Sequence, residues 1–161
     1  MATKFHDLKE KAYFIGGYLT ARKRGLDGKW TDLWKKPVKN IITDAALAQI
    51  ALLLIDASAV PFTYGAIGSD NTTPVGGDTG CKAQLDCQAA TMSRVTTSVA
   101  NDTIQAVSTH TASGSWSVKE YVLKNASGSG GTALNRIIFT AIPLGTSEVL
   151  EFTYKCQMRT S

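Results

Sequence analysis

A chain of 161 residues makes one domain, or one domain with an arm, and can bury a core without metal or disulfide staples. Hydrophobic residues make up 43% of the chain and charged residues 19%, a balance that suits a globular protein with β-structure and many turns. The net charge is +4, and we expect no signal peptide or membrane span, because the N-terminus lacks an apolar core and the apolar run Ala45–Ile55 is too short.

The positive charge is concentrated at the N-terminal end. Residues 1–39 hold ten Lys or Arg against four Asp or Glu, whereas the remainder holds seven against nine. Residues 1–16 read as a charged and aromatic arm that either docks on its own domain or reaches a neighbour. This charge favours an acidic partner, nucleic acid or protein, on this side of the molecule, and the alternative interpretation is a basic hairpin that is only solvated.

A β-hairpin is predicted next. Strand patterns at residues 18–24 and 30–36 flank a turn that contains Asp27-Gly28, a dipeptide typical of tight hairpins, and a proline follows the second strand. Trp30 and Trp34 lie an even number of residues apart, so they are expected to share one strand face and to enter the core.

One long helix is predicted over Asn40–Ile55. Asn40 or Thr43 can cap it, and Asp44 in the first turn complements the helix dipole. Apolar residues recur at one-face spacing and cover more than half of the girth. The helix is therefore expected to be buried against a sheet.

The signature stretch of the chain is Pro61–Thr79. Apolar and small residues alternate through Phe62, Tyr64 and Ala66, and the chain then enters a long polar loop rich in Gly, Asp, Asn and Pro. These glycines are not followed by Lys-Ser or Lys-Thr, so they are interpreted as turn residues and not as a phosphate-binding loop.

The rest of the chain reads as a run of antiparallel strands. A short helical turn is expected at 78–85, followed by strands at 92–99, 103–109, 115–123, 134–142 and 148–159. In the last strand Leu150, Phe152, Tyr154, Cys156 and Met158 should face the core. The sequence thus predicts a mainly β fold, an antiparallel β-sandwich with one buried α-helix after an N-terminal β-hairpin, with an arm at 1–16 and a single domain at 17–161.

No residue pattern indicates an enzyme, a cofactor or a metal site. His6 and His110 lack ligands at metal spacing, and His110 is interpreted as a surface residue beside a turn. Cys81, Cys87 and Cys156 are expected to be free, with Cys156 buried. Glu120 interrupts the alternation of its strand, which a bulge or a buried partner such as Arg94 or Arg136 would explain.

Several sequence blocks occur in an order that resembles small structural proteins of tailed bacteriophages and prophages, of the tail-fibre, head-fibre or minor virion type. These blocks are KNIITDAALAQIALLL, YGAIGSDNTTP, DTGCKAQL, SRVTTSV and SWSVKEYVLKNASGSGGTALNRIIF. The resemblance covers about residues 17–158. It implies a non-enzymatic β-sandwich subunit that assembles in the host bacterial cytoplasm and resides in the virion.

Capsid decoration, or a minor capsid protein, is the function that the resemblance and the basic N-terminal part together favour. A tail-fibre or baseplate adaptor for host attachment is the alternative, and nucleic-acid binding by the basic hairpin is a third hypothesis. The expected partners are a major capsid protein or tail and baseplate subunits, together with further copies of the chain. The residues expected to dock are Lys4, Phe5, Tyr13, Phe14, Arg22, Lys23, Arg24, Lys35 and Lys36.

Overall fold

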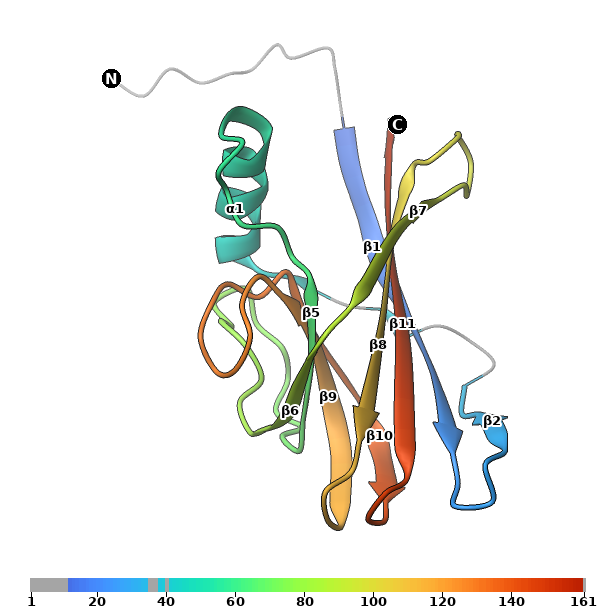
Figure 1. Cartoon of the computed structure of the whole chain (residues 1–161). Coiled ribbons are helices and arrows are strands. Elements are labelled where there is room, and N and C mark those ends of the chain that lie inside the picture. Colours follow the sequence, from blue (N-terminus) through green and yellow to red (C-terminus); the bar gives the residue numbers. More distant parts are fainter. Residues whose placement is uncertain (1–11, 35–37, 40, 161) are drawn as a thin grey trace.

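Two antiparallel sheets face each other and enclose one main core. The structure is a computed structural model, and it describes residues 12–34, 38–39 and 41–160. Figure 1 shows the two layers, with the single helix α1 standing beside one end of the sandwich. The predicted fold class, a mainly β antiparallel sandwich with one helix after an N-terminal hairpin, is confirmed.

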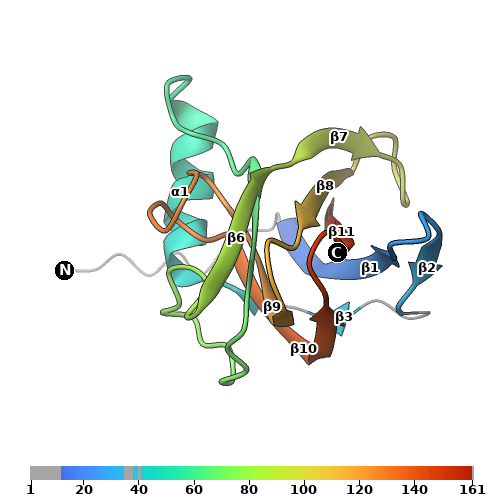
Figure 2. The same cartoon turned by 60° about the horizontal axis from the view of Figure 1, so that its bottom comes forward.

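The strand order separates the chain into two layers. The first sheet runs β2-β1-β11-β8-β7, with β3 also paired to β1, and the second runs β4-β10-β9-β5-β6. The elements are β1 (Ala12–Arg24), β2 (Trp30–Asp32), β3 (Val38–Lys39), β4 (Ile41–Ile42), α1 (Asp44–Ile55), β5 (Tyr64–Gly68), β6 (Gln84–Ala89), β7 (Thr91–Val95), β8 (Thr103–Thr111), β9 (Trp116–Lys124), β10 (Asn135–Leu144) and β11 (Val149–Thr160). Between β6 and β7 the chain crosses from the second sheet to the first, as Figure 2 shows.

The longest strand pairing joins the beginning of the described chain to its end. β1 and β11 pair from Ala12 opposite Thr160 to Arg24 opposite Val149. Along β11 the inward residues are fully or almost fully buried, as the alternation predicts, up to and including Cys156. Met158 continues the pattern but is 41% exposed, because the sandwich opens at this end.

The predicted hairpin is present, but its two tryptophans lie in different environments. β2 ends at Asp32, so Trp34 does not share a strand face with Trp30. Trp34 packs into the core, with its ring 4.8 Å from the ring of Phe139, whereas Trp30 stays 38% exposed on the hairpin. The expectation that both tryptophans enter the core is therefore wrong for Trp30.

Of the two predicted caps, Thr43 is the one that helix α1 uses, and the helix is far less buried than expected. The Thr43 side chain accepts a hydrogen bond from the Ala46 amide at 3.1 Å and caps the helix. The helix starts later than predicted because Ile41 and Ile42 pair with β10 as strand β4. Ala46 is its one fully buried residue, and Ile50 and Leu53 are half-buried against the core. The prediction of a buried helix is thus wrong, since α1 packs at one end of the sandwich and turns much of its apolar girth outward.

The segment 78–85 does not form the helical turn that was expected. β6 begins at Gln84 and pairs with β5, so this segment is a turn that leads into a strand. The amides of Lys82 and Ala83 donate to the carboxylate of Glu120 instead of to carbonyl groups one helical turn back. A tertiary acceptor thus replaces the local hydrogen bonds that a helix needs.

Candidate functional site

A buried arginine fixes the signature stretch to the second sheet. Arg136 of β10 is fully buried, and its Nε donates to Glu120 of β9 at 2.7 Å. Its Nη2 donates to Asp70 at 2.8 Å, and its Nη1 lies 3.3 Å from Asp78 and 2.9 Å from the carbonyl of Thr72. Both acidic loop residues are therefore held by one guanidinium group.

Glu120 is the second centre of the same cluster. Its buried carboxylate accepts hydrogen bonds from the backbone amides of Asp70, Lys82 and Ala83. Gly68 lies so close to this carboxylate that a Cβ at position 68 would collide with the Glu120 carboxylate and the Ala83 carbonyl. The predicted buried partner of Glu120 is thus confirmed as Arg136.

The charges in this cluster stabilise one another. Burial lowers the pKa of Arg136, but the hydrogen bonds and charges of Glu120 and Asp78 outweigh burial and hold that pKa above its usual value. Burial raises the pKa of Asp78, but the Val75 amide and Arg136 outweigh it, so the pKa of this carboxyl is lowered. Ionised and compensated groups of this kind hold a loop in place, whereas a general acid or base needs a pKa near neutrality.

A second polar chain lies between the sheets and has the connectivity of a Ser-His-Asp triad. His110 Nδ1 is 2.9 Å from an Asp86 carboxylate oxygen, and His110 Nε2 is 3.1 Å from Ser108 Oγ. Burial raises the pKa of Asp86, but the hydrogen bonds from His110 and Gln88 bring that pKa below its usual value. Because an ionised carboxylate can only accept, Nδ1 is the donor of the hydrogen bond to Asp86.

The accessibility of this chain does not fit a nucleophile. His110 and Ser108 are 0% and 1% exposed. The Ser108 side chain faces Gly65 of the opposite sheet so closely that any Cβ there would collide with it. A substrate would have to part the two sheets to reach Ser108. The prediction that His110 is a surface residue is wrong, because the even spacing of Ser108 and His110 puts both on the inner face of β8. That spacing was the available signal.

The basic hairpin presents an exposed tryptophan beneath two arginines. The guanidinium carbons of Arg22 and Arg24 lie 4.4 and 5.4 Å from the Trp30 ring centroid. Arg22 also pairs with Glu151 at 2.6 Å, and Lys23 pairs with Glu148 at 2.7 Å. The hairpin thus offers a stiff cationic and aromatic surface, part of whose charge is already neutralised.

The structure places only some of the residues expected to dock. Arg22 and Arg24 come together on the exposed face of β1 beside β2, whereas Lys23 lies on the opposite face and pairs with Glu148. The backbone of Tyr13 and Phe14 forms part of β1, but the structure does not describe their side chains. The remaining expected docking residues lie outside the described residues: Lys4, Phe5, Lys35 and Lys36.

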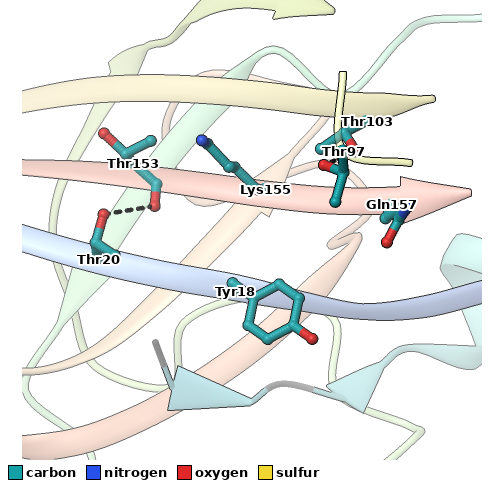
Figure 3. Close-up of a pocket in the computed structure, with 7 residues that line it drawn as sticks. All are labelled: Tyr18, Thr20, Thr97, Thr103, Thr153, Lys155 and Gln157. Carbon is teal, nitrogen blue, oxygen red and sulfur yellow. Dashed lines mark hydrogen bonds between the residues drawn. The ribbon is translucent and has the colours of Figure 1, made fainter. Parts of the chain in front are cut away.

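A shallow polar groove of about 400 Å³ lies on the outer face of the first sheet (Figure 3). Its lining consists of Tyr18, Thr20, Thr97, Thr103, Thr153, Lys155 and Gln157. The Thr20 hydroxyl donates to the Thr153 carbonyl, and Gln157 donates to Ser98 and Asp102. Because these groups are already engaged within the chain, the groove leaves mainly the Tyr18 ring and the Lys155 ammonium group for a ligand.

The described cysteines and acidic residues form no metal or redox centre. Among the described residues no group of three or more His, Cys, Asp or Glu could hold a metal ion. The same ranges contain no helix that is both long and apolar enough to cross a bilayer. All three cysteines are free, as expected, and burial raises the thiol pKa of Cys81 and of Cys87. Their sulfur atoms are therefore thiols, which are poor nucleophiles, at neutral pH.

Comparison with known proteins assigns no family. No family model, no curated protein and no solved structure matches the chain. A function for this protein therefore has to be argued from the described residues and their geometry.

Proposed function

We propose that this protein is a non-enzymatic structural subunit of a tailed-phage virion, a decoration or minor capsid protein that docks through its basic N-terminal part. The observation that carries the proposal is the exposed Trp30 with Arg22 and Arg24 stacked over it. Tryptophan and arginine are the residues most enriched at the energetic centres of protein interfaces. The ordered sequence blocks that resemble virion proteins give this surface its expected partner.

The rest of the fold supports a mechanical role. Arg136 and Glu120 hold the signature loop on the second sheet by hydrogen bonds and ion pairs. In the first sheet, the pairing of β1 with β11 joins both ends of the described chain. A subunit that must keep its shape against neighbours on a particle benefits from both features. The one triad-like arrangement, at Ser108, is closed off inside the sandwich.

The hairpin suits an acidic protein surface better than a nucleic acid. Glu151 and Glu148 already neutralise Arg22 and Lys23 in part, which weakens the pull on a phosphate backbone. Guanidinium groups also lie over the Trp30 ring, where a stacked base would have to go. On the virion, such a surface would meet an acidic patch of the major capsid protein.

Co-sedimentation tests the proposal. The full chain is mixed separately with purified shells and with purified tails of the phage or prophage that encodes it, over a series of salt concentrations. We expect it to pellet with shells and to dissociate as salt rises. Arg24→Glu should abolish pelleting, whereas Lys155→Glu, the same charge change on the outer face of β11, should not.

The outcomes separate the competing functions. Pelleting with tails alone, or immunogold label at the tail, would replace capsid decoration by the tail-fibre or baseplate adaptor. A salt-sensitive gel shift with nucleic acid but no binding to either particle would favour the third hypothesis. If neither particle nor nucleic acid binds the chain, the virion proposal is overturned.

A further inference from the structure

The sandwich is open at the end where α1 stands. A groove of about 650 Å³ lies between the helix and the inner faces of both sheets. Its lining is almost wholly apolar and consists of Ile50, Leu53, Leu54, Pro61, Phe62, Thr63, Met92, Ile104, Leu123, Leu134, Cys156 and Met158. A hollow of this size and composition in a soluble domain marks a surface that another chain segment covers.

The groove continues into exposed apolar residues on α1. Leu54 and Ile55 are 82% and 85% exposed at the end of the helix, and Leu47 and Leu52 are also exposed. These side chains are the reason why the prediction of a buried helix failed. The apolar face of α1 exists, but the monomer covers only the part around Ala46.

Strand β1 begins beside this groove. β1 begins at Ala12 opposite Thr160, and Phe14 pairs with Met158, which lines the groove. Eleven residues precede β1, enough to reach roughly 35–40 Å when extended. Phe5 and Leu8 lie three residues apart in this segment, a spacing that puts both on one side of a helical turn.

We propose that the groove receives the N-terminal segment, residues 1–11, of a second copy of this chain, with Phe5 and Leu8 as the side chains that enter it. This inference rests on the docking role given above to the N-terminal part, and it names a second copy as that part's partner. It does not require the virion assignment.

The direction of β1 favours a second copy over the chain's own groove. Pairing with β11 holds the backbone extended at Ala12, so the direction of β1 at this residue points past the end of β11. Entry of residues 1–11 into the chain's own groove would require the chain to reverse this direction, and the strong turn formers Gly and Pro are absent from residues 1–15. A neighbour placed ahead of the strand accepts the segment without a reversal.

Charge also favours this occupant. The last turn of α1 carries no basic residue, and its C-cap is Asp56, whose pKa is lowered by hydrogen bonds from Ser58. The C-terminal end of α1, which contributes Leu53 and Leu54 to the groove, therefore combines an ionised carboxylate with the negative end of the helix dipole. The segment brings Lys4, Lys9 and Lys11 around its apolar residues.

Sedimentation of the full chain over a concentration series gives the first test. We expect reversible self-association, and Leu54→Glu should weaken it about tenfold or more, as loss of a buried anchor does. The matched control is Leu26→Glu, because Leu26 is 78% exposed at the hairpin tip and Leu54 is 82% exposed. A chain that remains monomeric at every concentration overturns the inference, and so does equal weakening by the two variants.

Cross-linking gives the second test and distinguishes the two grooves. Full-length Leu8→Cys protein is mixed with full-length Met158→Cys protein of different mass under mild oxidation. Both proteins also carry Cys156→Ser, because the Cys156 thiol itself lines the groove. We expect a mixed disulfide-linked dimer, with little product when Leu26→Cys replaces Met158→Cys or when the Cys156→Ser protein replaces either variant. A cross-link that forms only inside a doubly substituted monomer places the segment in its own groove and overturns the inference, as does no cross-link at all.

Failure of this inference and failure of the proposed function are separable. The mixed dimer reports on the groove, whereas pelleting with virion particles reports on Arg24 of the hairpin. Mixed dimers without particle binding leave the inference standing and remove the virion assignment. Particle binding by a protein that forms no mixed dimer does the reverse.

Discussion

Arg136 and Arg22 hold a glutamate in the same way in two different regions of the molecule. Arg136 Nε is 2.7 Å from Glu120, and Arg22 Nε is 2.6 Å from Glu151. The Arg136 side chain is fully buried, whereas that of Arg22 is 45% exposed on the hairpin. Water competes for the second pair but not for the first, so similar geometry fixes a loop in one place and leaves a cation available to a partner in the other.

Removing the buried guanidinium group gives the largest expected effect. Arg136→Ala leaves the buried Glu120 without its counter-ion and should cost about 3–5 kcal/mol of unfolding free energy. Urea denaturation followed by circular dichroism measures the loss. Arg22→Ala is the matched control and should cost about 1 kcal/mol or less, because that pair is exposed. Equal losses in the two variants would show that burial does not separate the two arginines.

The buried histidine extends the comparison to the polar chain between the sheets. His110→Leu removes the ring that joins Asp86 to Ser108 and should cost about 1–3 kcal/mol, since it leaves buried polar groups unsatisfied. Thr109→Ala, on the outward face of the same strand, is the control and should change stability by roughly half a kcal/mol at most. A negligible effect of His110→Leu would mean that the polar chain contributes no stability.

Acid should weaken the buried region through its aspartates. The Thr72 side chain and amide lower the pKa of Asp70, and Arg136 adds to this; the pKa of Asp78 is lowered as described above. A carboxyl whose folded pKa is lowered stabilises the fold above its unfolded pKa of about 4, and this stability is lost as pH falls through the folded value. Denaturation midpoints between pH 7 and pH 2 should therefore fall in wild type and fall less steeply in the Asp70→Asn/Asp78→Asn variant. Parallel curves would contradict this.

The exposed hairpin should give the smallest change in stability. Trp30→Ala removes cation–π contacts at an exposed site, which are worth about 0.5–1 kcal/mol. Its effect should appear instead as lost pelleting with virion particles. Trp34→Ala is the contrast, because Trp34 packs on Phe139 and Phe152 and should cost about 3–5 kcal/mol. Normal pelleting by Trp30→Ala would remove the hairpin from the docking surface.

Local patterns alone predicted most of the layers. Alternation in the final strand identified the buried face from Leu150 to Cys156, because a strand between core and solvent has a period of two residues. Thr43 and Asp44 marked the start of the helix, and Asp27-Gly28 marked the hairpin, because caps and tight turns depend on a few adjacent residues. The break at Glu120 even predicted a buried partner.

Tertiary structure decided the features that depend on a hydrogen-bond acceptor far away in the sequence, or on whether an apolar surface is covered by the rest of the domain. Glu120 took the amides of residues 82 and 83, which turned an expected helical turn into the approach to β6. The spacing on β8 places His110 on the inner face, but its contact with Asp86 joins strands of two different sheets, and no local pattern contains that contact. The sequence predicted the apolar face of α1. How much of that face the sandwich buries depends on where the helix packs. Interactions between neighbouring residues specify the secondary-structure elements and their ends. Burial is set only when the layers assemble, and burial decides whether a polar or apolar side chain stabilises the core or remains available to a partner.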